Sequence, residues 1–196
     1  MEGTLGMGGS VRARVIRRER APLAWKAANL RHVLPGLAQD AVAKALGMNH
    51  MAGRLYAVKR GADGRVVDYG LICTQQVTTA FCALMVDQLQ AETSVWGDFK
   101  YHDSGVGTTA EADGDTAIET TDGEDRVAGT QTEGTSVQYK SVGTIAYTTT
   151  KAITEHGLFN HATDPTLMDR SVFSAINVVN GDSIEFTFTL TCTAGG

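Results

Sequence analysis

The strongest constraint on the fold is an alternation of residue types near the C-terminal end of this 196-residue chain. Across residues 183–192 every second side chain is apolar: Ile184, Phe186, Phe188, Leu190 and Cys192. Threonine and glutamate fill the positions between them from residue 185 onward. Because successive side chains of a strand point to opposite faces, this pattern predicts a strand with one face in a core and the other in water.

Further strands are predicted around this one. The turn Asn180-Gly181-Asp182 precedes it, so we predict a C-terminal hairpin with residues 171–179. A second hairpin is predicted from residues 54–59 and 65–73, because the loop between them contains Asp63-Gly64. Three more candidate strands are residues 136–142, 144–150 and 153–159.

The fold class predicted from these strands is mainly β: an antiparallel β-sandwich or a jelly-roll-like body, with one or two short helices. One helix is predicted over residues 34–47, with Pro35 near its start and Gly47 at its end. Residues 79–91 are apolar nearly all round, which favours a buried helix over a central strand. We therefore divide the chain into an extended basic arm with the short helix, residues 1–53, and an acidic β-rich body, residues 54–196.

The net charge of -5 hides two opposite halves. Residues 1–60 hold eleven Lys and Arg against three Asp and Glu, which gives +8, whereas residues 61–196 hold six against nineteen, which gives -13. Nine of these acids lie in residues 103–134, where we predict long surface loops. The basic arm is glycine-rich and self-repelling, so it needs a partner surface to become ordered.

That partner could be nucleic acid or an acidic protein surface, and a plain solvated tail is the third interpretation. No aromatic residues alternate with the arginines to stack on bases, which favours a protein partner over nucleic acid. The candidate docking residues are Arg12, Arg14, Arg17, Arg18, Arg20, Trp25, Leu34 and Leu37.

The motifs of common active sites are missing from the sequence. There is no Gly-x-Ser-x-Gly elbow, no phosphate-binding loop and no regular spacing of metal ligands, so we predict no catalytic, cofactor-binding or metal-binding residues. A hydrolase site near His102 and Ser104 is the enzyme alternative. No stretch approaches the roughly 20 apolar residues of a membrane-spanning helix, so no membrane partner is expected.

Several strings in the C-terminal half resemble a family of tailed-bacteriophage virion proteins. They are YHDSGVGTTAE (101–111), GDTA (114–117), GTQTEG (129–134), EHGLF (155–159), LMDRSVF (167–173) and GDS (181–183). Within that family the chain resembles head decoration or cement proteins, and related β-modules also occur in neck and fibre components. The resemblance spans about residues 54–196 and leaves out the arm.

This resemblance implies a non-enzymatic structural protein that needs no cofactor. The implied partners are the major capsid protein and neighbouring virion subunits, and the implied state is a homo-oligomer. The expected location is the virion capsid, assembled in the host cytoplasm. On this hypothesis the arm and the helix dock while the acidic body faces outward, and a neck, tail or fibre protein is the alternative.

Overall fold

The computed structural model describes residues 18–75, 77–89, 98–163 and 165–193. The elements in chain order are β1 (Arg18–Arg20), α1 (Leu23–Ala45), β2 (His50–Arg60), β3 (Val66–Gln75), α2 (Thr79–Leu89), β4 (Tyr101–Gly105), β5 (Val127–Ala128), β6 (Thr130–Thr135), β7 (Gln138–Ala146), β8 (Lys151–Phe159), β9 (Leu167–Val178) and β10 (Ser183–Thr193).

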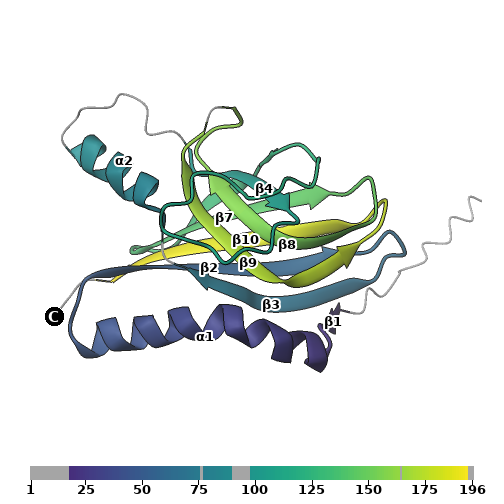
Figure 1. Ribbon diagram of the computed structural model, residues 1–196, viewed down its shortest axis with the longest axis horizontal. Coiled ribbons are helices and arrows are strands. Elements are labelled where there is room, and N and C mark those ends of the chain that lie inside the picture. Colours follow the sequence, from purple (N-terminus) through teal and green to yellow (C-terminus); the bar gives the residue numbers. More distant parts are fainter. Residues whose placement is uncertain (1–17, 76, 90–97, 164, 194–196) are drawn as a thin grey trace, which may run out of the picture.

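Two sheets packed together form the body, which confirms the predicted β-sandwich (Figure 1). The six-stranded sheet has the order β1-β3-β2-β10-β7-β6, and the four-stranded sheet has the order β5-β4-β8-β9. Apart from β1, which runs parallel to β3, the paired strands are antiparallel. Fully buried apolar side chains from both sheets share one core, among them Leu55, Ile72, Ile153, Ile176 and Phe186.

Strand β10 lies inside the six-stranded sheet and pairs with β2 and with β7. Ile184, Phe186, Phe188 and Leu190 are buried, as the alternation predicted, while Cys192 is exposed at the end of the strand. A strand with neighbours on both sides and an apolar face against the second sheet is well specified by its own sequence.

The prediction of a C-terminal hairpin is wrong. The turn exists, with Gly181 at φ +86°, but β9 pairs with β8 while β10 pairs with β2 and β7, so the chain crosses from one sheet to the other. The Asp182 carboxylate holds this crossing by accepting the N–H groups of Ala62 (2.9 Å) and Val179 (3.0 Å). Turn residues specify that the chain reverses its direction. A hairpin within one sheet and a crossing between the two sheets bury the same apolar faces, so the local sequence cannot distinguish them.

The other predicted strands are confirmed with one change. Strands β2 and β3 form the predicted antiparallel hairpin, and β8 covers residues 153–159. Strand β7 is continuous from Gln138 to Ala146. Residues 147–150 were predicted to belong to a strand, and they do not. The predicted break fell at Gly143, which is instead a close-packing position inside the strand.

Helix α1 is longer than predicted, because it begins at Leu23 and contains Pro35 in its interior. Residues 23–33, predicted as extended, are therefore helical. The helix ends as predicted, with Gly47 at φ +63° and the Met48 N–H bonded to the Ala43 carbonyl at 2.9 Å.

Helix α2 is a helix, as favoured over a strand, but its predicted burial is wrong. Among its described residues Phe81 alone is buried, edge-on against Phe99 with ring centroids 5.1 Å apart. Figure 1 shows α2 standing away from the two sheets. The prediction of loops across residues 103–134 is also partly wrong, because Asp103 and Ser104 lie buried in β4 and residues 130–135 form β6.

Candidate docking surface

Helix α1 is fastened to both sheets by polar side chains. The indole N–H of Trp25 donates to the Ala175 carbonyl of β9 at 2.9 Å. The amide of Asn29 donates to the Ile72 carbonyl of β3 at 2.7 Å and accepts the Ser174 N–H of β9 at 2.8 Å. The bonds to Ala175 and Ser174 satisfy backbone groups of β9, which is an edge strand of the four-stranded sheet among the described residues.

The middle of α1 lies very close to β3. A Cβ on Gly36 would sit 2.3 Å from Oγ1 and 2.9 Å from the carbonyl oxygen of Thr74. The same hydroxyl donates to the Val33 carbonyl at 2.7 Å. Only glycine allows this approach, so the position of α1 depends on it.

We therefore expect Gly36→Ala to lower the free energy of unfolding by about 1–3 kcal/mol, although alanine is the better helix former by about 1 kcal/mol. The added methyl group must push α1 away from Thr74. Urea unfolding of the variant measures this. Gly114→Ala is the control, because nothing lies within 4 Å of its added Cβ; a Gly36→Ala protein as stable as the parent would contradict the close contact.

The outer face of α1 is apolar, which inverts the usual pattern of a surface helix. Leu23, Leu30, Leu34 and Leu37 are 85%, 50%, 55% and 37% exposed. At about 100° per residue they fall in one stripe, roughly 130° around the helix axis from the side that carries Trp25 and Asn29. We call these four residues the leucine stripe. Apolar side chains gathered in this way are typical of interaction surfaces.

The charges beside the leucine stripe are positive. Helix α1 carries Lys26, Arg31 and Lys44, and its single carboxylate, Asp40, is bound to Arg54 at 2.8 Å. Arg20 of β1, just before the helix, is exposed as well. The surface thus combines apolar contact with attraction for carboxylates.

The structure separates the predicted docking residues into three groups. Arg12, Arg14 and Arg17 lie outside the described residues. Arg18 binds Asp68 of the same chain at 3.1 Å, and Trp25 anchors α1 to the body, packing on Tyr69 with centroids 4.7 Å apart. Arg20, Leu34 and Leu37 face solvent, and Leu23 and Leu30 are the stripe residues that sequence reasoning missed.

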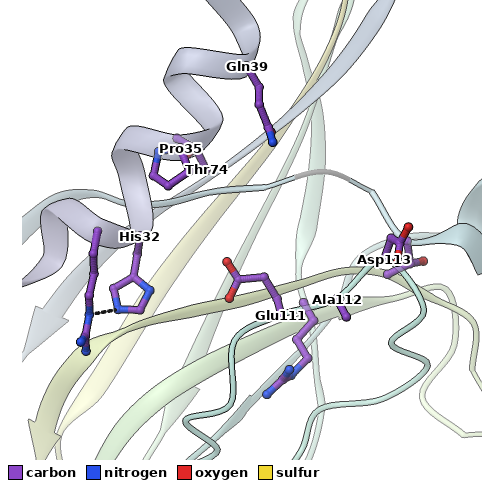
Figure 2. Close-up of a pocket in the computed structure, with 10 residues that line it drawn as sticks. His32, Pro35, Gln39, Thr74, Glu111, Ala112 and Asp113 are labelled. Atoms are coloured by element: carbon purple, nitrogen blue, oxygen red, sulfur yellow. Dashed lines mark hydrogen bonds between the residues drawn. The ribbon is translucent and has the colours of Figure 1, made fainter.

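A small polar cavity of about 230 Å³ lies beside α1. Figure 2 shows His32, Pro35 and Gln39 of the helix facing Glu111, Ala112 and Asp113. These three residues belong to the segment between β4 and β5, residues 106–126, which we call the acidic loop. Arg31 Nε donates to His32 Nε2 at 3.0 Å. Burial, followed by the charge of Arg31, lowers the pKa of His32. The cavity therefore lies where the basic helix meets the acidic loop.

The acidic loop is held to the body by a buried ion pair. Glu155 and Arg170 are 0% and 4% exposed and meet at 2.8 Å. Glu155 also accepts the N–H groups of Gly107 (2.9 Å), Glu119 (2.9 Å) and Thr120 (2.8 Å), while Arg170 binds Asp115 (3.0 Å) and Glu119 (3.3 Å). Part of the acidic charge is thus neutralised inside the molecule, whereas we had predicted solvated loops.

A second polar group lies between the sheets. His102 Nδ1 meets His156 Nε2 at 2.9 Å, and His102 Nε2 meets Ser141 Oγ at 2.8 Å. Burial lowers the pKa of His102 to about 3; burial, then the neighbouring His102, lowers the pKa of His156 as well. Asp169, which accepts the Ser171 hydroxyl at 2.7 Å, has its pKa raised by burial to about 7.

The residues of the enzyme alternative belong to this interior. His102 and Ser104 share the inward face of β4 and are 0% and 1% exposed. They bind different partners, because the Ser104 hydroxyl donates to Asp122 and lies 3.1 Å from the Tyr147 hydroxyl. A substrate would have to open the sandwich to reach either side chain.

Two other classes of site have no candidate among the described residues. In that part of the chain, no group of three or more His, Cys, Asp or Glu side chains is placed to hold a metal ion. Neither described helix is long and apolar enough to cross a membrane. Comparison of the chain with protein-family models, curated proteins and solved structures gives no match.

Proposed function

We propose that this protein is a non-enzymatic structural component of a tailed-phage virion, a capsid cement or decoration protein that binds major capsid subunits. The observation that carries the proposal is the leucine stripe on α1. The sequence resemblance suggests that the assembly is a phage virion, and helix α1 provides the candidate contact surface.

The stripe supports a docking role because leaving leucine side chains in contact with water is unfavourable in free energy. Each fully buried leucine contributes roughly 1.5–3 kcal/mol, so covering even part of four of them is favourable. The inner face of α1 is already used by Trp25 and Asn29, and Gly36 holds the helix against β3. In the part of the chain that the structure describes, the leucines are therefore accessible to a second molecule without any rearrangement of the body.

The flanking cations support a partner with exposed carboxylates. Arg20, Lys26, Arg31 and Lys44 lie on or next to α1, and the three arginines of residues 12–17 precede them in the sequence. On this proposal the capsid surface presents apolar side chains flanked by Asp and Glu. Binding should then weaken as salt increases, because the charges on such a rim are screened.

The test is co-sedimentation of purified protein with capsids that lack it. We expect Leu34→Glu to weaken binding at least about tenfold, equivalent to 1.4 kcal/mol, because it places a charge in the apolar contact. Val137→Glu is the matched control, since Val137 is 54% exposed and Leu34 55%. Equal binding by the two variants would refute the docking role of the stripe.

Two further measurements complete the test. Deletion of residues 1–17 leaves β1 and α1 in place and isolates the contribution of the first three arginines. Copies per virion distinguish the two positions: on the order of hundreds place the protein on the shell, and about a dozen or fewer place it in the neck, tail or fibre.

A further inference from the structure

A cavity of about 410 Å³ lies between the C-terminal half of α1 and the strands β2 and β10. Ala52 of β2 and Thr191 of β10 are direct partners in the sheet and both line the cavity. Alanine has no side chain beyond its Cβ, so the surface of the sheet is low at this point. Arg54, two residues further and about 7 Å along β2, lines the cavity as well.

The helix side of the cavity is a single row of α1. Leu37, Ala41 and Lys44 line it, and spacings of four and three residues place them on one face of the helix. Leu37 also belongs to the leucine stripe. The cavity therefore adjoins the C-terminal end of the stripe, and a molecule that covers the stripe comes within reach of it.

Residues of the cavity carry hydrogen-bond donors that the described part of the chain leaves unused. The Nε–H group of Arg54 is buried and has no partner among the described residues. Thr191 Oγ1 accepts the side-chain amide of Gln138 at 3.1 Å, so the threonine hydroxyl hydrogen is free to donate. The exposed Lys44 adds an ammonium group. This set of donors fits an oxygen ligand that only accepts hydrogen bonds.

The charges around the cavity favour a ligand with a single negative charge. Arg54 and Lys44 are cations, and Asp40, which also lines the cavity, is bound to Arg54 at 2.8 Å. With His50 neutral the lining therefore has a net charge of +1. A carboxylate balances this charge and accepts from the donors. A phosphate with two charges would exceed it and would be repelled by the Asp40 carboxylate.

We propose that this cavity binds the carboxylate of an Asp or Glu side chain that belongs to the protein covering the leucine stripe. The inference rests on the proposed docking function, and it adds the residue type that the partner presents beside its apolar surface. A hydrogen bond from a guanidinium or ammonium group to a carboxylate is about twice as strong as a neutral one. Such a contact fixes the partner at one position along α1.

The first experiment titrates the isotope-labelled protein with sodium acetate at constant ionic strength and follows the amide resonances by NMR. The resonances of Ala41, Ala52 and Thr191 should shift and saturate. Lys44→Met should weaken acetate binding at least about fivefold, because it removes one of two cations. Lys26→Met makes the same change near the other end of α1 and should leave the affinity unchanged.

Three results of this titration would overturn the proposal. They are shifts that do not saturate, equal acetate affinity of Lys44→Met and the parent, and tighter binding of inorganic phosphate than of acetate.

The second experiment uses capsids that lack the protein and identifies the source of the carboxylate. Lys44→Met should weaken co-sedimentation at least about threefold, and acetate should compete with capsids for the parent protein more than for this variant. Acetate that binds the cavity without competing would mean that the site serves a free carboxylate, against the proposal.

Leu34→Glu separates this inference from the docking function on which it rests. If Leu34→Glu weakens capsid binding and Lys44→Met does not, the stripe docks and the cavity inference fails. If neither variant weakens binding, the docking function itself fails. Circular dichroism of both variants checks that they are folded.

Discussion

Replacement of Arg170 by methionine should lower the free energy of unfolding by about 3–5 kcal/mol. The guanidinium is 4% exposed and binds the fully buried Glu155 together with Asp115 and Glu119. Without it the Glu155 carboxylate remains buried with backbone N–H groups but no counter-charge. Urea unfolding at neutral pH measures the loss.

The matched control is Arg60→Met. Its ion pair with Glu185, at 3.3 Å, joins side chains that are 50% and 33% exposed, so its removal should cost less than about 1 kcal/mol. The two variants make the same chemical change in different surroundings. Equal losses would mean that Arg170 contributes no more than a surface charge and that the acidic loop is held by other contacts.

Acidification should destabilise the protein strongly. His102 and His156 are buried with pKa values below the ordinary 6.5, so their stabilising contribution is complete above pH 6.5 and is lost as pH falls toward the folded values. Each histidine that is neutral in the fold and charged when unfolded removes about 1.4 kcal/mol per pH unit. Unfolding measured in steps from pH 7.5 to 4.5 should show a steep decline.

Asp169 opposes this decline and provides the internal check. Its pKa is raised from 3.8 to about 7, so its contribution is complete below pH 3.8 and is lost as pH rises to 7. Asp169→Asn removes this opposing effect, and the decline on acidification should steepen by about 1.4 kcal/mol per pH unit between pH 4 and 7. Parallel curves for parent and variant would contradict a protonated Asp169 in the fold.

The strands could be predicted from sequence where one face is buried and the other is not. Residues 184–190 alternate because β10 has a core on one side only, and the first hairpin has a recognisable Asp63-Gly64 loop. The partner of β9 could not be predicted, because the turn at Gly181 serves a sheet crossing as well as a hairpin. Pairing across the sandwich depends on contacts that are distant in sequence.

The candidate site was predicted in part. Leu34 and Leu37 were selected, whereas Leu23 and Leu30 were missed because the helix was predicted to begin only at residue 34. The usual assumption that the apolar side of a helix faces inward fails for α1, whose inner side is fixed by hydrogen bonds from Trp25 and Asn29. No local sequence pattern predicts that the apolar side of a helix faces solvent.

The buried polar groups had no sequence signal at all. Glu155 and Arg170 are opposite charges in adjacent strands, but their burial comes from the loop that carries Gly107 and Thr120. That loop is rich in glycine, threonine and acids, and composition alone assigned it to solvent. Glu155 is covered because the loop folds back over it in three dimensions, which its sequence does not indicate.

The bonds from Trp25 and Asn29 to β9 also affect behaviour in concentrated solution. An edge strand with free backbone groups is a template on which other chains can add and aggregate. Helix α1 occupies the Ala175 carbonyl and the Ser174 N–H of that edge, so we expect it to hinder the addition of another chain there. A preparation in which α1 is loosened should precipitate well before the sandwich itself unfolds.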